Sequence, residues 1–441
     1  MTNFIKAIKD IWSIEELRQK ILLTLGLIVV YRFMAGVPLP GIDPLQLSAL
    51  KDNTSGGLLG LLNAFTGGAF SRASIMALGI MPYISASIVV QLMGIAVPYL
   101  QKLQKDGESG RKKITQITRW LTILITMVQG PTYIAAIQNQ FGLPDSAFLV
   151  PDATFWISSM VLLTAGTIFA MWLGERITDK GVGNGISLLI TVGIIANFPA
   201  AFLQELAAKT QNAGAGGIMM ILIEIIVWFV VILLSVYLVT AVRKIAVQYA
   251  RRTVAGNIQN VAGSREYIPL KLNAAGVMPI IFAQAIMFLP AYIGRKYPSL
   301  AELQDINGLW YNVLFAVLII IFSYFYTAIT IPTNKMAEDL KRSGGFIPGI
   351  RPGKDTADRL DSVLSRITFP GSLFLAGLSI LPAIVVQFGV QQSWALFYGG
   401  TSLIIMVGVA IDTIQQINSY LLNRHYDSLM KGGTSNRKSS K

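Results

Sequence analysis

The sequence contains no cysteine, a single histidine and few charged residues. Of its 441 residues, Asp, Glu, Lys and Arg together make up 13%, which is about half the share in an average soluble domain. The absence of cysteine excludes disulfides, thiolate metal sites and a cysteine nucleophile. The lone His425 argues against histidine catalysis and against a multi-histidine metal centre. We therefore expect no enzymatic activity, no metal and no cofactor.

The apolar share of the chain, in contrast, is large. Hydrophobic residues make up 53% of the sequence, and the mean hydropathy is +0.57. A transmembrane helix needs about 20 consecutive apolar residues, and unpaired backbone groups in lipid are costly, so we expect helical spans. Ten apolar segments fit this description, at residues 21–37, 73–97, 117–137, 153–173, 183–199, 217–241, 272–293, 309–331, 368–388 and 398–420.

Lysine and arginine predict the orientation of these spans. If the N-terminus lies inside, the cytoplasmic segments hold 30 of the 36 basic residues. Cytoplasmic loops of membrane proteins carry such an excess, so we predict that both termini face the cytoplasm. The same distribution argues against nucleic-acid binding as the reason for the net charge of +13, because the charge follows the membrane side.

The chain divides into two halves of five spans, which makes it an all-α polytopic membrane protein. Residues 21–199 form the first half, and residues 217–420 form the second. An odd number of spans per half gives the halves opposite orientations, a pattern known from inverted repeats. Residues 1–20 form a cytoplasmic amphipathic segment, and residues 421–441 form a basic cytoplasmic tail.

An apolar stretch lies between the first two spans. Residues 56–74 read GGLLGLLNAFTGGAFSRAS, which is long enough for a short helix but is interrupted by Gly67 and Gly68. Irregular backbone at membrane depth is tolerated only where it is buried in protein or lines a cavity. Two interpretations stay open, a re-entrant stretch without a special role or a lightly packed, movable stopper.

Six isoleucines lie within distinctive sequence words. Ile80 and Ile84 are spaced i,i+4, as are Ile186 and Ile190, so each pair shares a helix face. The words are ALGIMPYISAS, GNGISLLI, NAAGVMPII and GGTSLII, and the isoleucines are Ile80, Ile84, Ile186, Ile190, Ile281 and Ile405. Together with GVPLPGID, MWLGERITDKGVGNGIS and GGFIPGIRPGKDTADRLD, these words resemble the SecY/Sec61-alpha family of protein-conducting channels over nearly the whole chain.

The resemblance implies a channel in the bacterial plasma (inner) membrane. Such a channel translocates unfolded secretory polypeptides and releases transmembrane segments sideways into the lipid. The six isoleucines would form one ring around the pore. A narrow apolar ring dewets and so holds back ions, and β-branched side chains are stiff at χ1.

The resemblance also assigns a plug and a lateral gate. Residues 56–74 would be the plug, which closes the channel from outside, and its packing and hinge residues would be Leu61, Leu62, Phe65, Gly67 and Gly68. The lateral gate between the second and seventh spans would include Ser85, Ser87, Gln91 and Asn273. Small and polar residues form seams of modest strength between membrane helices.

Two long polar loops, at residues 241–272 and 332–367, should project into the cytoplasm. The resemblance implies that they dock the SecA motor ATPase or the ribosome. The docking residues would be Arg243, Lys244, Arg251, Arg252 and Arg351 in the loops, and Tyr426 in the tail. The family further implies the membrane subunits SecE and SecG, signal sequences, nascent polypeptides, membrane lipids and accessory insertion proteins as partners.

Two alternatives stay open from the residues alone. A ten-span secondary transporter would need ionisable groups near the midplane, and only Glu224 and Asp412 lie clearly inside the predicted spans. A structural scaffold without conduction would leave the isoleucines and residues 56–74 unexplained. The word GIRPGKDT is not a phosphate loop, because the glycine spacing of G-x-x-x-x-G-K-[ST] fails.

Overall fold

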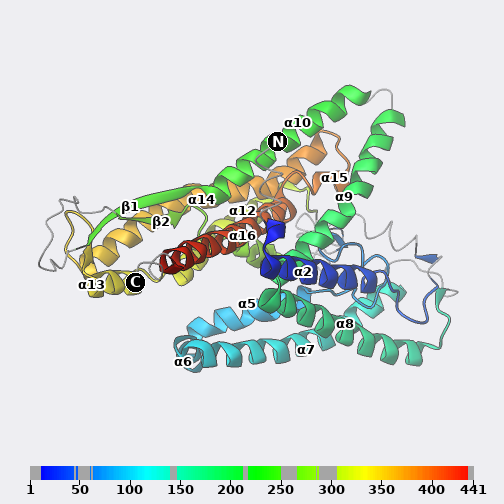
Figure 1. The fold of residues 1–441 in the computed structure, drawn as a ribbon. Helices are drawn as coiled ribbons and strands as arrows, with labels where there is room; N and C mark the ends of the chain where they lie inside the picture. The colour runs from blue at the N-terminus through cyan, green and yellow to red at the C-terminus, as the bar shows by residue number, and fades with distance from the viewer. Residues whose placement is uncertain are drawn as a thin grey trace, which may run out of the picture. The chain divides into compact units, whose positions relative to one another are not determined.

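The computed structural model describes residues 11–43, 46–47, 60, 63–139, 147–211, 217–249, 266–284, 286–287 and 305–435, with residues 423–435 described by their backbone alone. The described chain is mostly helical (Figure 1). It divides into two compact units, one formed by Met1–Glu205 and Val409–Lys441 and the other by Leu206–Gly408. These limits lie inside two long helices, whereas the sequence places the division in the connection between residues 199 and 217.

The first unit is built mainly from long helices. It contains α2 (Glu15–Met34), α5 (Met81–Ala96), α6 (Pro98–Lys105), α7 (Gly107–Asn139), α8 (Asp152–Lys180), most of α9 (Gly185–Gln211) and the later part of α16 (Gly400–Ser435). Helix α5 begins at Met81 because the preceding residues form turns, and Pro82 fits its first turn, where no N–H is needed.

The second unit combines membrane helices with a small sheet. Its helices are α10 (Gly217–Thr240), α12 (Leu309–Thr330), α13 (Thr333–Arg342), α14 (Lys354–Gln387), α15 (Gln392–Ala395) and the start of α16. Its strands are β1 (Val242–Tyr249), β2 (Glu266–Lys271) and β3 (Gly345–Phe346), in the antiparallel order β2-β1-β3.

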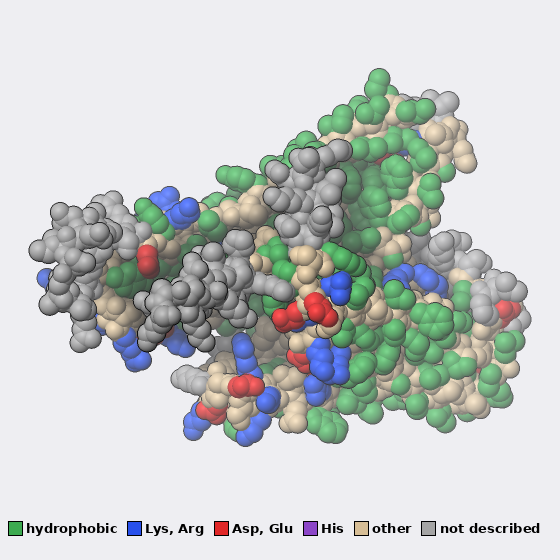
Figure 2. Space-filling view, in the orientation of Figure 1, with side chains coloured by type: hydrophobic (Ala, Val, Ile, Leu, Met, Phe, Trp, Pro, Cys, Tyr) green, Lys and Arg blue, Asp and Glu red, His purple; other side chains and the backbone are tan. Residues whose placement is uncertain are grey.

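Seven of the described helices are long and apolar enough to cross a membrane, and the bent pair α5–α6 would make an eighth. Figure 2 shows hydrophobic side chains spread over the surface of these helices, as lipid contact requires. Of the ten predicted spans, the first corresponds to α2, which does not pass the same test. The seventh is described only as far as Met287. The count of ten therefore stays a prediction.

The described parts of the two loops that we expect in the cytoplasm are folded, which the sequence did not predict. Strand β1 pairs with β2 within residues 241–272, and β3 adds to β1 from the other loop. Val247, Leu340, Ile347 and Leu360 form one core, against which Ile245, Ile268, Met336 and Ile350 pack. Both loops thus contribute to one structure (residues 242–249, 266–271 and 333–360), which we call the cytoplasmic subdomain after the predicted location of its loops.

Two further helices extend beyond their predicted spans. Helix α14 starts at Lys354 and runs without a break to Gln387, so the end of the predicted loop is helical. Helix α16 continues to Ser435, so the first part of the basic tail is helical as well. Apolar periodicity marks where a helix meets lipid or a core, but it does not mark where a polar continuation of that helix ends.

Candidate functional site

Four of the predicted ring isoleucines lie in the first unit. Ile80 immediately precedes α5, and the backbone N–H of Ile84 donates to the carbonyl of Ile80 at 3.1 Å. Ile80, Ile84 and Ile186 belong to one hydrophobic cluster with Tyr31 and Leu189. The i,i+4 spacing therefore places Ile80 and Ile84 one turn apart at the start of a helix, against the N-terminal turn of α9.

The remaining ring isoleucines have similar surroundings. Ile190 is buried in α9, one turn after Ile186. In the second unit, Ile405 is buried in α16 and Ile281 is partly buried in the short helix that starts at Met278. All six side chains are thus buried or half-buried, and none is among the exposed hydrophobic residues that face outward from the spans.

The described part of the plug-like segment, residues 63–74, is mostly buried rather than loosely exposed. Phe65, Gly67 and Gly68 are all buried. Leu61 and Leu62 lie outside the described residues. The glycine pair has φ values of +66° and +83°, a left-handed region that glycine adopts without steric cost. The predicted hinge glycines therefore form a tight turn whose conformation depends on glycine.

Two arginines converge on the carbonyl oxygen of Gly67. Arg32 donates from Nη1 at 3.1 Å, and Arg72 donates from Nη2, also at 3.1 Å. Arg32 comes from α2, whereas Arg72 follows the turn in the same segment. Hydrogen bonds from a charged donor are stronger than neutral ones, so these two bonds hold the turn firmly.

The same turn lies directly against α9. A Cβ atom added to Gly193 would approach the carbonyl oxygen of Phe65 to 2.5 Å, and one added to Gly67 would approach the Cα of Gly193 to 2.8 Å. The side chain of Asn197 also donates to the carbonyl of Asn63 at 3.4 Å. Glycine at both contact positions permits this close approach of two backbones.

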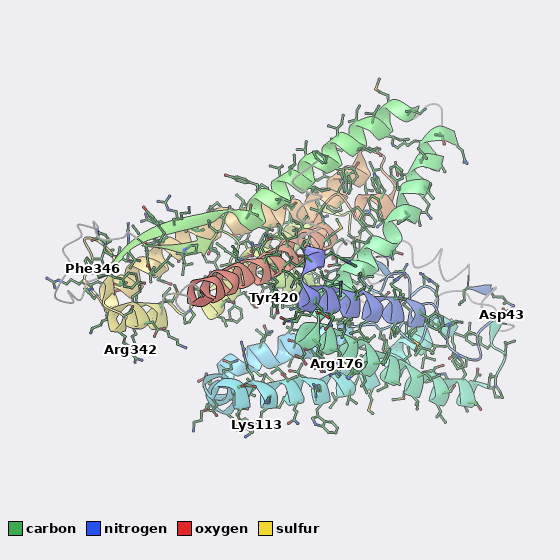
Figure 3. All side chains as sticks on the ribbon, in the orientation of Figure 1. Asp43, Lys113, Arg176, Arg342, Phe346 and Tyr420 are labelled. Atoms are coloured by element: carbon green, nitrogen blue, oxygen red, sulfur yellow. The ribbon has the colours of Figure 1, made fainter. Side chains whose placement is uncertain are left out.

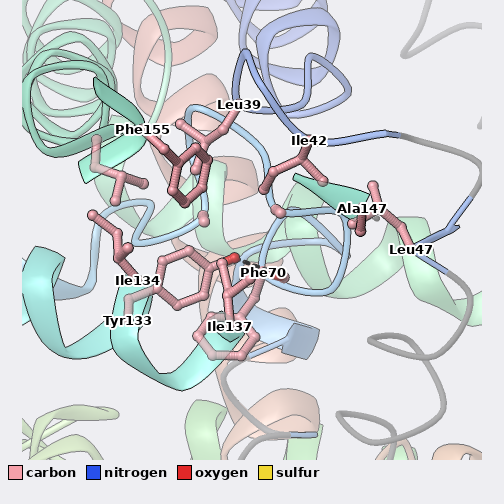
Figure 4. Packing of buried hydrophobic residues seen from close by; sticks show 12 residues of the cluster. Leu39, Ile42, Leu47, Phe70, Tyr133, Ile134, Ile137, Ala147 and Phe155 are labelled. Carbon is pink, nitrogen blue, oxygen red and sulfur yellow. Dashed lines mark hydrogen bonds between the residues drawn. The ribbon is translucent and has the colours of Figure 1, made fainter. Parts of the chain in front are cut away.

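The C-terminal part of the segment is tied to a separate core. Tyr133 donates from its hydroxyl to the carbonyl of Phe70 at 2.7 Å (Figure 4). The N–H of Leu39 donates to Ala73, and that of Ile75 donates to Val37. Phe70 and Tyr133 belong to a cluster of twelve buried residues that includes Leu39, Ile134 and Phe155. Residues 70–75 are thus an anchor rather than a mobile element.

The predicted lateral-gate residues are partly buried polar groups. Gln91 donates from Nε2 to the hydroxyl of Ser87 at 3.3 Å along one face of α5, and Ser85 is half-buried. In the second unit, Asn273 is buried, and its side-chain oxygen has no hydrogen-bond partner among the described residues. A buried oxygen without a hydrogen bond costs free energy, so this atom can accept a hydrogen bond from another polar group.

The described docking residues all lie on the cytoplasmic subdomain and are exposed. Arg243 and Lys244 are on β1, and Arg351 follows β3 in a turn between Gly349 and Gly353, whose φ values are +81° and +114°. Ile347 and Ile350 anchor this turn in the core. Figure 3 shows Phe346 and Arg342 at the end of this subdomain. Arg251 and Arg252 lie outside the described residues, as does the side chain of Tyr426.

The second unit contains a buried ion pair that the sequence did not predict. Lys209 of α9 lies 3.3 Å from the carboxylate of Glu224 in α10, and both side chains are only 6% exposed. Lys209 also donates to the carbonyl of Gly389 at 2.9 Å. No spacing rule in the sequence links two residues on either side of a connection between helices. Among the described residues, no group of three His, Cys, Asp or Glu side chains could hold a metal.

Comparison with known proteins yields one consistent family. The family model described as SecY matches residues 74–414. The protein translocase subunit SecY of Streptomyces coelicolor is 40% identical over 447 aligned residues, which cover 98% of this chain and 100% of that protein. The SecY subunit of Aquifex aeolicus is 38% identical, with the same shares covered.

Solved structures agree in fold. A structure described as "The structure of a protein conducting channel" matches with a TM-score of 0.59 and 18% identity, over 91% of each chain. Sec61 in a canine ribosome-channel complex matches with a TM-score of 0.55 and 18% identity, also over 91% of each chain. At such low identity these two likenesses show the fold alone, and the family rests on the curated relatives and the family model.

Proposed function

This chain belongs to the SecY family and is therefore a subunit of a protein-conducting channel in a bacterial membrane, and we propose how its residues carry out that function. The family assignment argues against the alternative of a ten-span secondary transporter, which the residues alone left open. We propose that unfolded secretory polypeptides cross the membrane through this subunit, and that transmembrane segments leave it sideways into lipid.

The central element of the proposal is a gate formed by the six isoleucines. It is supported by the clustering of Ile80, Ile84 and Ile186 at the facing ends of α5 and α9. Apolar, β-branched side chains in this setting offer no hydrogen bonds to a passing polypeptide and no coordination to an ion. Such a ring would let varied sequences pass while it closes against ions at rest.

The second element is the plug, of which we assign only the N-terminal part to movement. The two arginine hydrogen bonds to Gly67 and the anchor at Phe70 support a division at the glycine pair. Residues before Gly67 would move when a polypeptide enters, while residues 70–75 would stay in place. A plug that reseals reliably benefits from such a fixed attachment.

The third element is partner docking on the cytoplasmic subdomain. Sec61 in the ribosome-channel complex is a structural neighbour, and exposed Arg243, Lys244 and Arg351 suit acidic surfaces or RNA phosphate. We propose that SecA and the ribosome dock here and that a docked partner supplies the energy of transport, so that the subunit itself is not an enzyme. SecE and SecG would be its membrane partners.

Site-specific crosslinking tests the proposed polypeptide path. The chain has no cysteine, so one cysteine at Ile84 or Ile281 can be paired with a cysteine in the middle of a stalled secretory chain. We expect a disulfide at both positions and none at Ile223, which is exposed on α10. Absence of both crosslinks, with the stalled complex demonstrably docked, would contradict the isoleucine gate.

A further inference from the structure

Strand β1 of the cytoplasmic subdomain has one free edge. Residues Val242–Val247 pair with β2 along one edge. On the other edge only Gln248 and Tyr249 are paired, with the two residues of β3. Among the described residues, no backbone group pairs with Val242–Val247 on that second edge. About six residues of β1, or roughly 20 Å of strand, therefore have no strand neighbour on this edge within the part of the chain that the structure describes.

Pro269 indicates which backbone groups point to the free edge. It lies on β2 opposite Lys244. Because proline has no N–H, it fits a pair whose backbone groups point away from each other rather than toward each other. The N–H and C=O of Lys244 then point away from β2. By alternation, those of Val242 and Ala246 do the same, so three residues direct both backbone groups to an edge where no described residue pairs with them.

The two outer edges of the sheet differ in their protection. Proteins block exposed strand edges with proline, charge or a covering element. On β2, Pro269 occupies the outward edge. On β1, the sequence from Val242 to Tyr249 contains no proline. Its two charges, Arg243 and Lys244, have the same sign and so oppose the addition of a basic strand but not of an acidic one. The strand is held in place by Val247 in the core. The β1 edge is thus preorganised for strand addition, and β3 already uses its far end.

The charges at this edge select the occupant. Arg243, Lys244 and Lys271 are exposed at the end of the sheet nearest α10. Arg243 and Lys244 are adjacent in a strand, so their side chains point to opposite faces of the sheet. An added strand also presents alternate side chains to both faces, so acidic residues on either face would meet a basic partner.

We propose that the free edge of β1 binds an extended, acidic segment of a cytoplasmic protein by adding it as a further strand beside Val242–Val247. This inference deepens the docking role of the subdomain and rests on it. Backbone pairing supplies affinity in such complexes, and side chains supply selectivity. The edge therefore accepts acidic segments with little regard to their remaining sequence.

The test uses the full-length chain in lipid nanodiscs and a fluorescent synthetic peptide of about ten alternating Glu and Val residues. We expect saturable binding, which Ala246→Pro weakens about tenfold or more because it removes an edge N–H. Replacing Ala246 by lactate removes the same N–H with little change of shape and should weaken binding in the same direction. Tyr267→Pro is the matched control on the outward edge of β2, and it should change binding by less than about twofold.

Three outcomes would overturn the inference. The first is that a peptide of alternating Lys and Val residues binds as tightly as the Glu–Val peptide. The second is that neither change at Ala246 alters the affinity for the Glu–Val peptide. The third is that the infrared spectrum of the bound, carbonyl-labelled peptide shows no β-strand band.

Binding of SecA to the Arg351→Glu variant separates failure of this inference from failure of the proposed function. If the Arg351→Glu variant no longer binds SecA and the peptide does not bind the unmodified chain, docking on the subdomain is supported and strand addition at β1 is wrong. If SecA binding is also unchanged, docking on this subdomain is wrong as well.

Discussion

The hydroxyl oxygen of Tyr133 lies 2.7 Å from the carbonyl oxygen of Phe70, and the two rings are 4.8 Å apart at a tilt of 56°. One side chain of α7 therefore holds both the backbone and the ring of the plug-like segment. Because both groups are buried, no water replaces this bond when it is broken.

We predict that Tyr133→Phe lowers stability by about 1–3 kcal/mol, because the carbonyl of Phe70 loses its donor while the ring contact stays. Thermal unfolding in detergent measures this effect. Tyr237→Phe, at a side chain that is 74% exposed, should leave the melting temperature unchanged. Equal melting temperatures for the two variants would show that the hydrogen bond does not hold the anchor.

Gly67→Ala should displace the plug turn. The added Cβ would collide with the guanidinium of Arg32 and approach the backbone of Gly193, and the φ of +66° is unfavourable for alanine. We expect raised resting ion conductance in planar bilayers. Gly130→Ala is the control, since its Cβ would meet nothing within 4 Å. If Gly67→Ala leaves the resting ion conductance unchanged, this turn takes no part in closing the channel.

Ile84→Gly combined with Ile190→Gly should make the closed channel leak ions, because removing two side chains widens and wets an apolar constriction. Val89→Gly combined with Ile195→Gly removes similar volume from exposed positions on the same two helices. Single-channel recording should detect leak only in the first pair. Unchanged resting conductance there would count against a gate made of isoleucines.

Lys209→Met should destabilise the second unit by about 3–5 kcal/mol, because it leaves the carboxylate of Glu224 buried without its cation. Combining Lys209→Met with Glu224→Leu removes both charges and should restore most of that loss. Thermal unfolding of the three proteins forms the comparison. If the double variant is no more stable than the single one, the ion pair is not the source of the effect.

Arg351→Glu should abolish partner-driven transport and leave membrane insertion of the chain intact, because it places a negative charge in the exposed turn that the proposal assigns to docking. Export of a secretory protein into vesicles measures transport, and protease protection measures insertion. Arg342→Glu, on the exposed end of α13, is the charge-matched control. Normal export by Arg351→Glu would remove this arginine from the docking surface.

Membrane character and family membership followed from the sequence because both depend on local signals. Apolar runs determine where helices cross lipid, and the words around Ile80 and Ile186 are contiguous in the chain. Seven of the ten predicted spans are confirmed as helices long and apolar enough to cross a membrane. The role of the six isoleucines stays a prediction, since it depends on their position around a pore.

Contacts between distant residues could not be predicted from the sequence. Arg32 lies in the first apolar segment, and only the fold brings it to the carbonyl of Gly67, 35 residues away in the sequence. The sheet was missed for a related reason. Strand β3 has two residues, too few for any period, and the alternation in β1 is masked by Arg243 and Lys244 at its start.

The connections of the cytoplasmic subdomain have a mechanical consequence. Only Ala241 separates the last residue of α10 from the first residue of β1, and Leu272 donates a hydrogen bond back to the carbonyl of Ala241. Helix α14 passes without interruption from the core of the subdomain into its membrane span. A force applied by a docked protein would therefore reach two membrane helices as a torque, with no slack linker to absorb it.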